Sequence, residues 1–185
     1  MAEPLRRLFT ASEYHTMLDA GILKEGDRVE LIEGEILQMP PIGSYHAGGV
    51  NRLNALFTSL LGRRAVVSVQ NPVHLSNLSE PQPDLLILRF RDDFYSEQLP
   101  APADVLLLIE VADSSLEFDR RTKAGLYARH GIPEVWLQDL KNGALLVHRD
   151  PSPQGYREVK IFHRGERLSP LAFPDLIIEV DAILG

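Results

Sequence analysis

Two carboxylates lie next to segments whose sequence predicts buried strands. Asp84 opens the apolar run 85–88, and Glu110 closes the apolar run 105–109. Short continuous apolar runs are typical of central strands covered on both faces. An ionised carboxylate there is costly unless a cation compensates its charge. If the two strands are neighbours, both carboxylates reach one point and form an oxygen-rich site of the kind that Mg²⁺ or Mn²⁺ prefers. The alternative is that each carboxylate lies at a strand end in water.

Lys123 is the third residue whose surroundings are unexpected. On a helix with 100° per residue it shares a face with large apolar side chains, so its ammonium needs a partner. The strand that ends at Glu110 directly precedes this helix, which makes that carboxylate the natural partner. The alternative is that the long stem carries the charge out to solvent. The residues that share the face are Leu116, Leu126, Tyr127 and His130.

A divalent cation, two carboxylates and a nearby lysine indicate hydrolysis of a phosphate ester. The metal activates a water molecule and neutralises charge on a phosphodiester. The lysine stabilises the developing negative charge or orients the water. It is a poor general base unless burial and the metal lower its pKa.

The patterns along the chain predict one mixed α/β (α+β) domain over residues 1–185, with a central sheet flanked by helices. Regular βαβ alternation is absent. Helices are expected over 10–21, with a Thr10–Glu13 capping box, over 44–61, with Ser44 as N-cap, and over 114–131, with a Ser114–Glu117 capping box. Hairpins are expected around Glu33-Gly34 and Asn142-Gly143, and strands over 65–69, 84–88, 105–111 and 156–162, with further strands and loops over 168–180.

Composition excludes several classes of site. The absence of Cys removes disulfides, zinc–thiolate sites and cysteine nucleophiles. The six His residues show no HExxH spacing, and no GxGxxG, Walker A or GxSxG motif occurs. The longest apolar run is far shorter than the roughly 20 residues of a membrane span, and the first residues do not resemble a signal peptide, so a cytoplasmic location is expected.

The formal net charge of −7 argues against broad, non-specific contacts with nucleic acid, because those need clustered Lys and Arg. Three short arginine clusters are present, and each is most typical of a solvated face. If the clusters Arg89 with Arg91 and Arg120-Arg121 flank one cleft, they would position phosphates without reading bases. The clusters are Arg63-Arg64, Arg89 with Arg91, and Arg120-Arg121.

Five blocks of the sequence resemble the Uma-two family of endonucleases. They are VELIEGEIL, SYHAGGVNRL, QPDLLIL, LLLIEVADSS and DRRTKAGLYARHGIPEVWLQDL, and the resemblance covers roughly residues 9–176. It implies the restriction-endonuclease-like PD-(D/E)xK fold, DNA as the substrate and Mg²⁺ or Mn²⁺ as the cofactor.

The resemblance also assigns roles residue by residue. Pro83-Asp84 corresponds to the PD element and Glu110 to the acidic residue of the (D/E)xK element. The third position of that element is Ala112, and Lys123 supplies the lysine from the following helix. The implied catalytic residues are Asp84, Glu110, Lys123, His46 and Glu30, and the implied metal ligands are Asp84, Glu110 and the Val111 carbonyl. Tyr127 also matches, although a tyrosine at a core-facing helix position is usually a packing residue.

We therefore predict a metal-dependent endonuclease acting on DNA. The first alternative is a non-catalytic binding module on a nuclease scaffold, which the acidic net charge favours. The second is a hydrolase of a small phosphorylated molecule. A homodimer is expected because double-strand cutters often act in pairs, and the apolar segment 171–184 is either core or a dimer surface.

Overall fold

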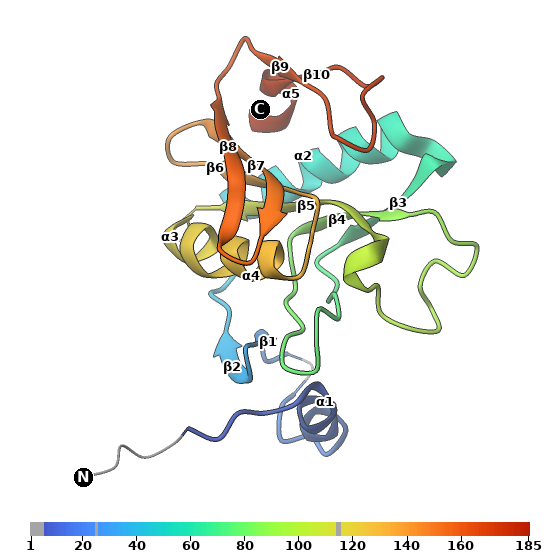
Figure 1. Ribbon diagram of the computed structural model, residues 1–185, viewed down its shortest axis with the longest axis vertical. Helices are drawn as coiled ribbons and strands as arrows, with labels where there is room; N and C mark the ends of the chain where they lie inside the picture. The colour runs from blue at the N-terminus through green and yellow to red at the C-terminus, as the bar shows by residue number, and fades with distance from the viewer. Residues whose placement is uncertain (1–5, 25, 114–115) are drawn as a thin grey trace.

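A mixed sheet of six strands forms the centre of the molecule (Figure 1). The computed structural model describes residues 6–24, 26–113 and 116–185. The strand order is β3-β4-β5-β6-β7-β8, with β5 and β6 parallel and the other neighbours antiparallel. The strands are β3 (Ala65–Val69), β4 (Leu85–Arg89), β5 (Val105–Ala112), β6 (Glu134–Asp139), β7 (Ala144–Ser152) and β8 (Gly155–Phe162). The expected α/β class and central sheet are confirmed.

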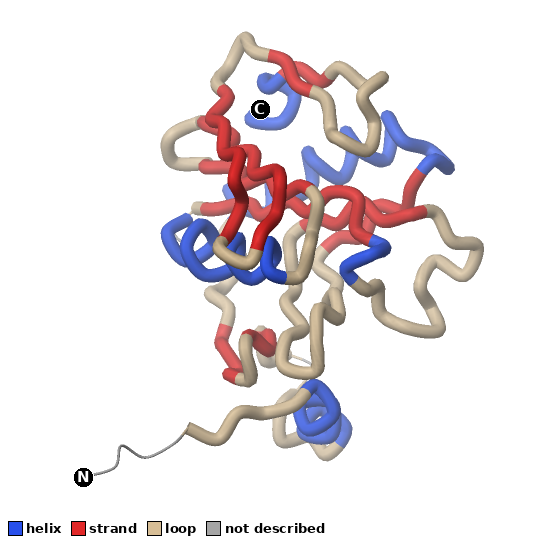
Figure 2. Tube along the Cα trace, viewed as in Figure 1, coloured by secondary structure: helices blue, strands red, loops and turns tan. Residues whose placement is uncertain are grey.

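The interior strands β4 and β5 are covered on both faces, as their continuous apolar runs predict. Alternate side chains enter two different core clusters. Leu85 and Ile109 belong to the cluster under α2 (Ser44–Leu61), whereas Leu86 and Leu108 belong to the cluster under α4 (Ala124–Arg129). Figure 2 shows these helices on opposite sides of the strands. A charged side chain that is buried between the sheet and one of these helices needs a partner there.

Helix α2 has the bounds that its apolar period predicts, and Val50, Leu53 and Phe57 face the sheet from it. The predicted cap is wrong by one residue. Gly43 is the N-cap, and Ser44 is the first helical residue. No side chain caps this end of the helix.

The segment after β5 is not the single regular helix that was predicted. It consists of α3 (Leu116–Phe118), the π-helix η3 (Asp119–Lys123) and α4. The amide of Ala124 donates to the carbonyl of Asp119, which is the i→i+5 bond of a π turn. Both end residues of η3, Asp119 and Lys123, are buried. The predicted capping box at Ser114 lies outside the described residues.

The N-terminal elements lie to one side of the sheet, at the bottom of Figure 1. Helix α1 (Ala11–Asp19) carries the predicted capping box between Thr10 and Glu13. The hairpin of β1 (Val29–Ile32) and β2 (Glu35–Gln38) turns at Glu33 and Gly34, whose φ angles are 50° and 81°. A tight hairpin turn of this kind requires positive φ angles, which glycine adopts readily. The hairpin carries Glu30 to the edge of the α4 face.

The C-terminal segment is core rather than an open surface. Phe173, Ile178, Val180 and Ile183 are buried in the α2 cluster, although Leu171 and Ile177 are exposed. No helix among the described residues is long and apolar enough to cross a bilayer. The remaining elements are η1 (Gly62–Arg64), η2 (Pro102–Asp104), β9 (Arg167–Leu168), β10 (Ile178–Glu179) and α5 (Val180–Leu184).

Candidate active site

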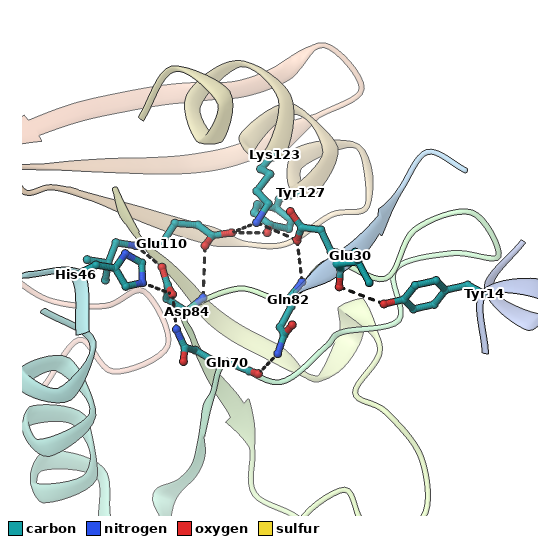
Figure 3. A network of polar contacts seen from close by, with 11 residues as sticks. Tyr14, Glu30, His46, Gln70, Gln82, Asp84, Glu110, Lys123 and Tyr127 are labelled. Carbon is teal, nitrogen blue, oxygen red and sulfur yellow. Dashed lines mark hydrogen bonds and ion pairs between the residues drawn. The ribbon is translucent and has the colours of Figure 1, made fainter. Parts of the chain in front are cut away.

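The pairing of β4 with β5 brings the two predicted carboxylates together (Figure 3). Leu85 is opposite Ile109, so Asp84 lies beside Glu110 where the antiparallel strands begin and end. The Asp84 amide donates to Glu110 Oε2 at 3.4 Å, and the Val111 amide donates to Asp84 Oδ2 at 2.8 Å. The two acidic groups therefore share one buried point and do not reach separately into water.

Lys123 is buried between two carboxylates. Its Nζ is 3.2 Å from Glu110 Oε1 and 3.1 Å from Glu30 Oε2. The partner predicted from the helix face is thus present, and the lysine does not extend to solvent. Glu30 adds a second partner from the β1–β2 hairpin, and the Gln82 amide donates to the same Glu30 oxygen at 3.1 Å.

Tyr127 takes part in this network as well as in the core. It is fully buried, and its hydroxyl donates to Glu110 Oε1 at 2.6 Å. This directional bond restrains the orientation of the Glu110 carboxyl group in addition to the packing around it.

His46 and Gln70 hold the other carboxylate. His46 Nε2 is 2.9 Å from Asp84 Oδ1, and Gln70 Nε2 donates to the same oxygen at 3.1 Å. The hydrogen bond to Asp84 raises the pKa of His46, while partial burial opposes the shift. His46 comes from the first turn of α2, so both layers of the fold contribute to the site.

Burial and neighbouring charges shift the pKa values of Glu110 and Lys123. Removal from water raises the pKa of Glu110 to about 8, and the ammonium of Lys123 only partly counteracts this shift. Burial acts to lower the pKa of Lys123, but the carboxylates of Glu110 and Glu30 outweigh it, so its net shift is upward. Lys123 therefore remains a cation at neutral pH.

A pocket of about 460 Å³ opens onto these groups. All six residues predicted for the site line it: Glu30, His46, Asp84, Glu110, Val111 and Lys123. Gln70, Gln82, Arg28 and Asp119 also line it and were not predicted. None of the arginines of the three predicted clusters is among the lining residues, so those clusters do not flank this pocket.

Comparison with known proteins identifies the family. The Uma2 family model, described as "Putative restriction endonuclease", matches residues 11–181. The chain belongs to the Uma2 family. A crystal structure titled as a putative nuclease belonging to DUF820, from Anabaena variabilis, superposes with a TM-score of 0.73 at 17% identity, covering 95% of this chain and 97% of that one. No curated protein matches. The resemblance and the nuclease-like fold expected from the sequence are confirmed.

The Uma2 match spans every residue of the network, from Glu30 to Tyr127. The donor set suits a hard divalent cation, because Asp84 and Glu110 offer carboxylate oxygens from the adjacent ends of two paired strands, each bonded to an amide of the other strand. No group of three or more His, Asp or Glu among the described residues is arranged to hold a metal ion. Mg²⁺ is usually bound through one or two carboxylates and keeps several waters, so these two suit it.

Proposed function

We propose that this Uma2-family protein is an endonuclease that hydrolyses phosphodiester bonds of DNA with Mg²⁺ or Mn²⁺. The observation that carries the proposal is the convergence of Asp84, Glu110 and Lys123 at one buried point that opens into a pocket. Asp84 and Glu110, with the Val111 carbonyl, are the proposed ligands. When bound, the metal would activate water and neutralise charge on the phosphate.

Side chains of the pocket supply the remaining functions in hydrolysis. Hydrolysis forms a P–O bond to water and breaks the P–O bond to the leaving sugar oxygen, which takes up a proton. Lys123 stabilises the negative charge that develops on the phosphate oxygens, since its raised pKa makes it a fixed cation and not a base. Glu30 shares that cation with Glu110. His46 orients Asp84 through the contact at 2.9 Å.

The proposal is tested by DNA cleavage with Glu110→Gln and Lys123→Ala in Mg²⁺ and Mn²⁺. Both variants are expected to lose cleavage, whereas Lys160→Ala, which removes an exposed ion pair with Glu158, is expected to keep it. Intact cleavage in both site variants, with an unchanged circular dichroism spectrum, would remove these residues from the mechanism.

Removal of Lys123 leaves two buried carboxylates without their cation, which typically costs about 3–5 kcal/mol and threatens folding. The double variant Glu30→Gln with Lys123→Met removes one charge of each sign and keeps the local balance. It is expected to fold and to be inactive. Cleavage by this folded variant would contradict the role of Lys123.

The acidic net charge of −7 supports the alternative of a non-catalytic binding module. Calorimetry with Mn²⁺ separates the two functions. If the protein is the proposed nuclease, we expect one bound Mn²⁺ per chain, and we expect Asp84→Asn to lose it. A scaffold without catalysis needs no such metal site, so an absence of binding would favour the alternative. A panel of small phosphate esters tests the remaining alternative, a hydrolase of small phosphorylated molecules, and we expect no turnover of them.

The homodimer and the cytoplasmic location stay predictions. Most of the C-terminal segment is buried in the α2 cluster, and its exposed large apolar residues are Leu171 and Ile177. Light scattering is expected to give twice the 20.7 kDa of one chain. A mass of one chain under cleavage conditions would contradict the dimer.

A further inference from the structure

The charged groups of the site lie below the molecular surface. The side chains of Glu30, Glu110 and Lys123 are 3%, 4% and 6% exposed. A phosphate must therefore enter the pocket to contact them. A volume of about 460 Å³ is in the range of cavities that enclose one small molecule. It suits a single nucleotide that leaves its strand, and it does not suit a duplex, which stays stiff over tens of base pairs.

Part of the pocket lining is apolar. Phe118 of α3 and Ile42 of the loop before α2 both line the pocket, and 40% and 42% of their surfaces remain exposed. Leu37, Met39, Pro40 and Pro41 also line the pocket. A pocket with charged groups at its base and an open aromatic ring on its wall matches the two parts of a nucleotide, its phosphate and its base. Unpaired bases stack on aromatic side chains, whereas paired bases are already stacked on their neighbours.

The charge of the pocket also disfavours a duplex. Among the described residues, its lining carries five carboxylates, two of them the proposed metal ligands Asp84 and Glu110, and two basic side chains, Arg28 and Lys123. Duplex DNA carries one charge per about 1.7 Å of its axis, and a single strand has one per about 3.4 Å of duplex geometry. A flexible single strand brings less repulsion to an acidic protein. The five carboxylates are Glu30, Asp84, Glu110, Asp113 and Asp119.

We infer that the site takes single-stranded DNA, including unpaired tails and flaps, with one nucleotide in the pocket and its base stacked on Phe118. The cleavage part of this inference rests on the proposed function, and the binding part does not. Phe118 contributes affinity and positions the strand, while the ion network acts on the phosphate.

Cleavage is tested on three end-labelled DNAs of one sequence: a single strand, a blunt duplex, and a duplex with an unpaired 3′ tail. We expect the single strand and the tail to be cut at least tenfold faster than paired DNA. A duplex cut as fast as the single strand would overturn the inference and leave the proposed function standing. If no DNA is cut, the proposed function fails, and binding decides the inference.

Binding is measured by fluorescence anisotropy with the labelled single strand and the duplex, in the Glu110→Gln background with Mg²⁺ present. Base–aromatic stacking predicts that Phe118→Ala weakens single-strand binding about tenfold and that Phe118→Trp restores it. Phe94→Ala is the matched control, because Phe94 is 62% exposed and does not line the pocket. Its affinity is expected to equal that of the parent.

Two binding results would contradict the inference. One is equal affinity of the parent protein for the duplex and the single strand. The other is equal affinity of the Phe118→Ala and parent proteins for the single strand. Thermal melts of each variant identify a loss of fold, and Phe118→Trp, which keeps an aromatic ring, separates stacking from a structural role.

Discussion

Glu110 receives hydrogen bonds from three separate parts of the chain. Lys123 of η3, Tyr127 of α4 and the amide of Asp84 before β4 all contact its carboxylate. A buried carboxylate with this many donors has one preferred position, and metal-ligand chemistry depends on such fixed geometry. Tyr127 is the donor that can be removed without changing any charge.

Tyr127→Phe is therefore expected to lower both stability and activity. Removal of a buried hydrogen-bond partner costs about 1–3 kcal/mol, and a less constrained Glu110 should reduce kcat several-fold with little change in KM. Urea denaturation and steady-state cleavage measure the two effects. Tyr156→Phe is the matched control, because the Tyr156 hydroxyl donates to the Ile132 carbonyl at 2.7 Å outside the pocket. It should lose about 1 kcal/mol and keep kcat. Equal kcat in both variants would assign Tyr127 to packing alone.

The residues that could be predicted from the sequence are those that interrupt an apolar pattern. Asp84, Glu110 and Lys123 stand in apolar surroundings, where each charge demands a partner. Gln70 and Arg28 were missed because each lies at a strand end beside a polar loop, where a polar residue looks the same whether it faces solvent or a pocket. Their places depend on which loops pack together, and the sequence pattern carries no information about that.

Among the elements, predictions succeeded where a local signal is strong. The Asn142-Gly143 turn joins β6 to β7, and the helix expected over 44–61 is α2. The π-helix was missed because a fixed 100° period leaves no room for its extra residue. Lys123 and Tyr127 both lie at or after the end of η3, so the face that they share survives the interruption.

Two adjacent glycines in α2 test how closely this helix must approach β5. A Cβ at Gly49 would lie 3.0 Å from Val111 Cγ1, whereas a Cβ at Gly48 would meet nothing within 4 Å. Gly48→Ala is therefore expected to stabilise the protein by about 0.5–1 kcal/mol, the usual gain in a helix interior. Gly49→Val is expected to cost about 1–3 kcal/mol through overpacking.

Gly49→Val should also lower cleavage, since Val111 follows Glu110 and donates its amide to Asp84. Chemical denaturation and cleavage assays on the pair give both readouts. If Gly49→Val has the stability and activity of Gly48→Ala, then close contact between α2 and β5 does not position the site.

At the scale of the whole molecule, the buried site makes stability depend on pH. The pKa of Glu110 is raised to about 8 from its ordinary value of 4.5, so the folded state binds this proton more tightly than the unfolded chain does. Its contribution to stability is complete below about pH 4.5 and is lost as the pH rises through 8. The raised pKa of His46 acts in the same direction, while burial lowers the pKa of His148 and opposes it.

In a metal chelator, the free energy of unfolding of the parent protein is expected to fall between pH 5 and 8 relative to that of Glu110→Gln, whose side chain does not titrate. The difference between the two curves isolates Glu110, because both proteins share His46 and His148. Excess Mg²⁺ should then stabilise the parent at pH 8 by mass action and leave Glu110→Gln unchanged. Metal binding is expected to release a proton below pH 8, because the ion needs the ionised carboxylate. Parallel curves for the two proteins, with no effect of Mg²⁺ on either, would show that Glu110 neither titrates in this range nor binds the metal.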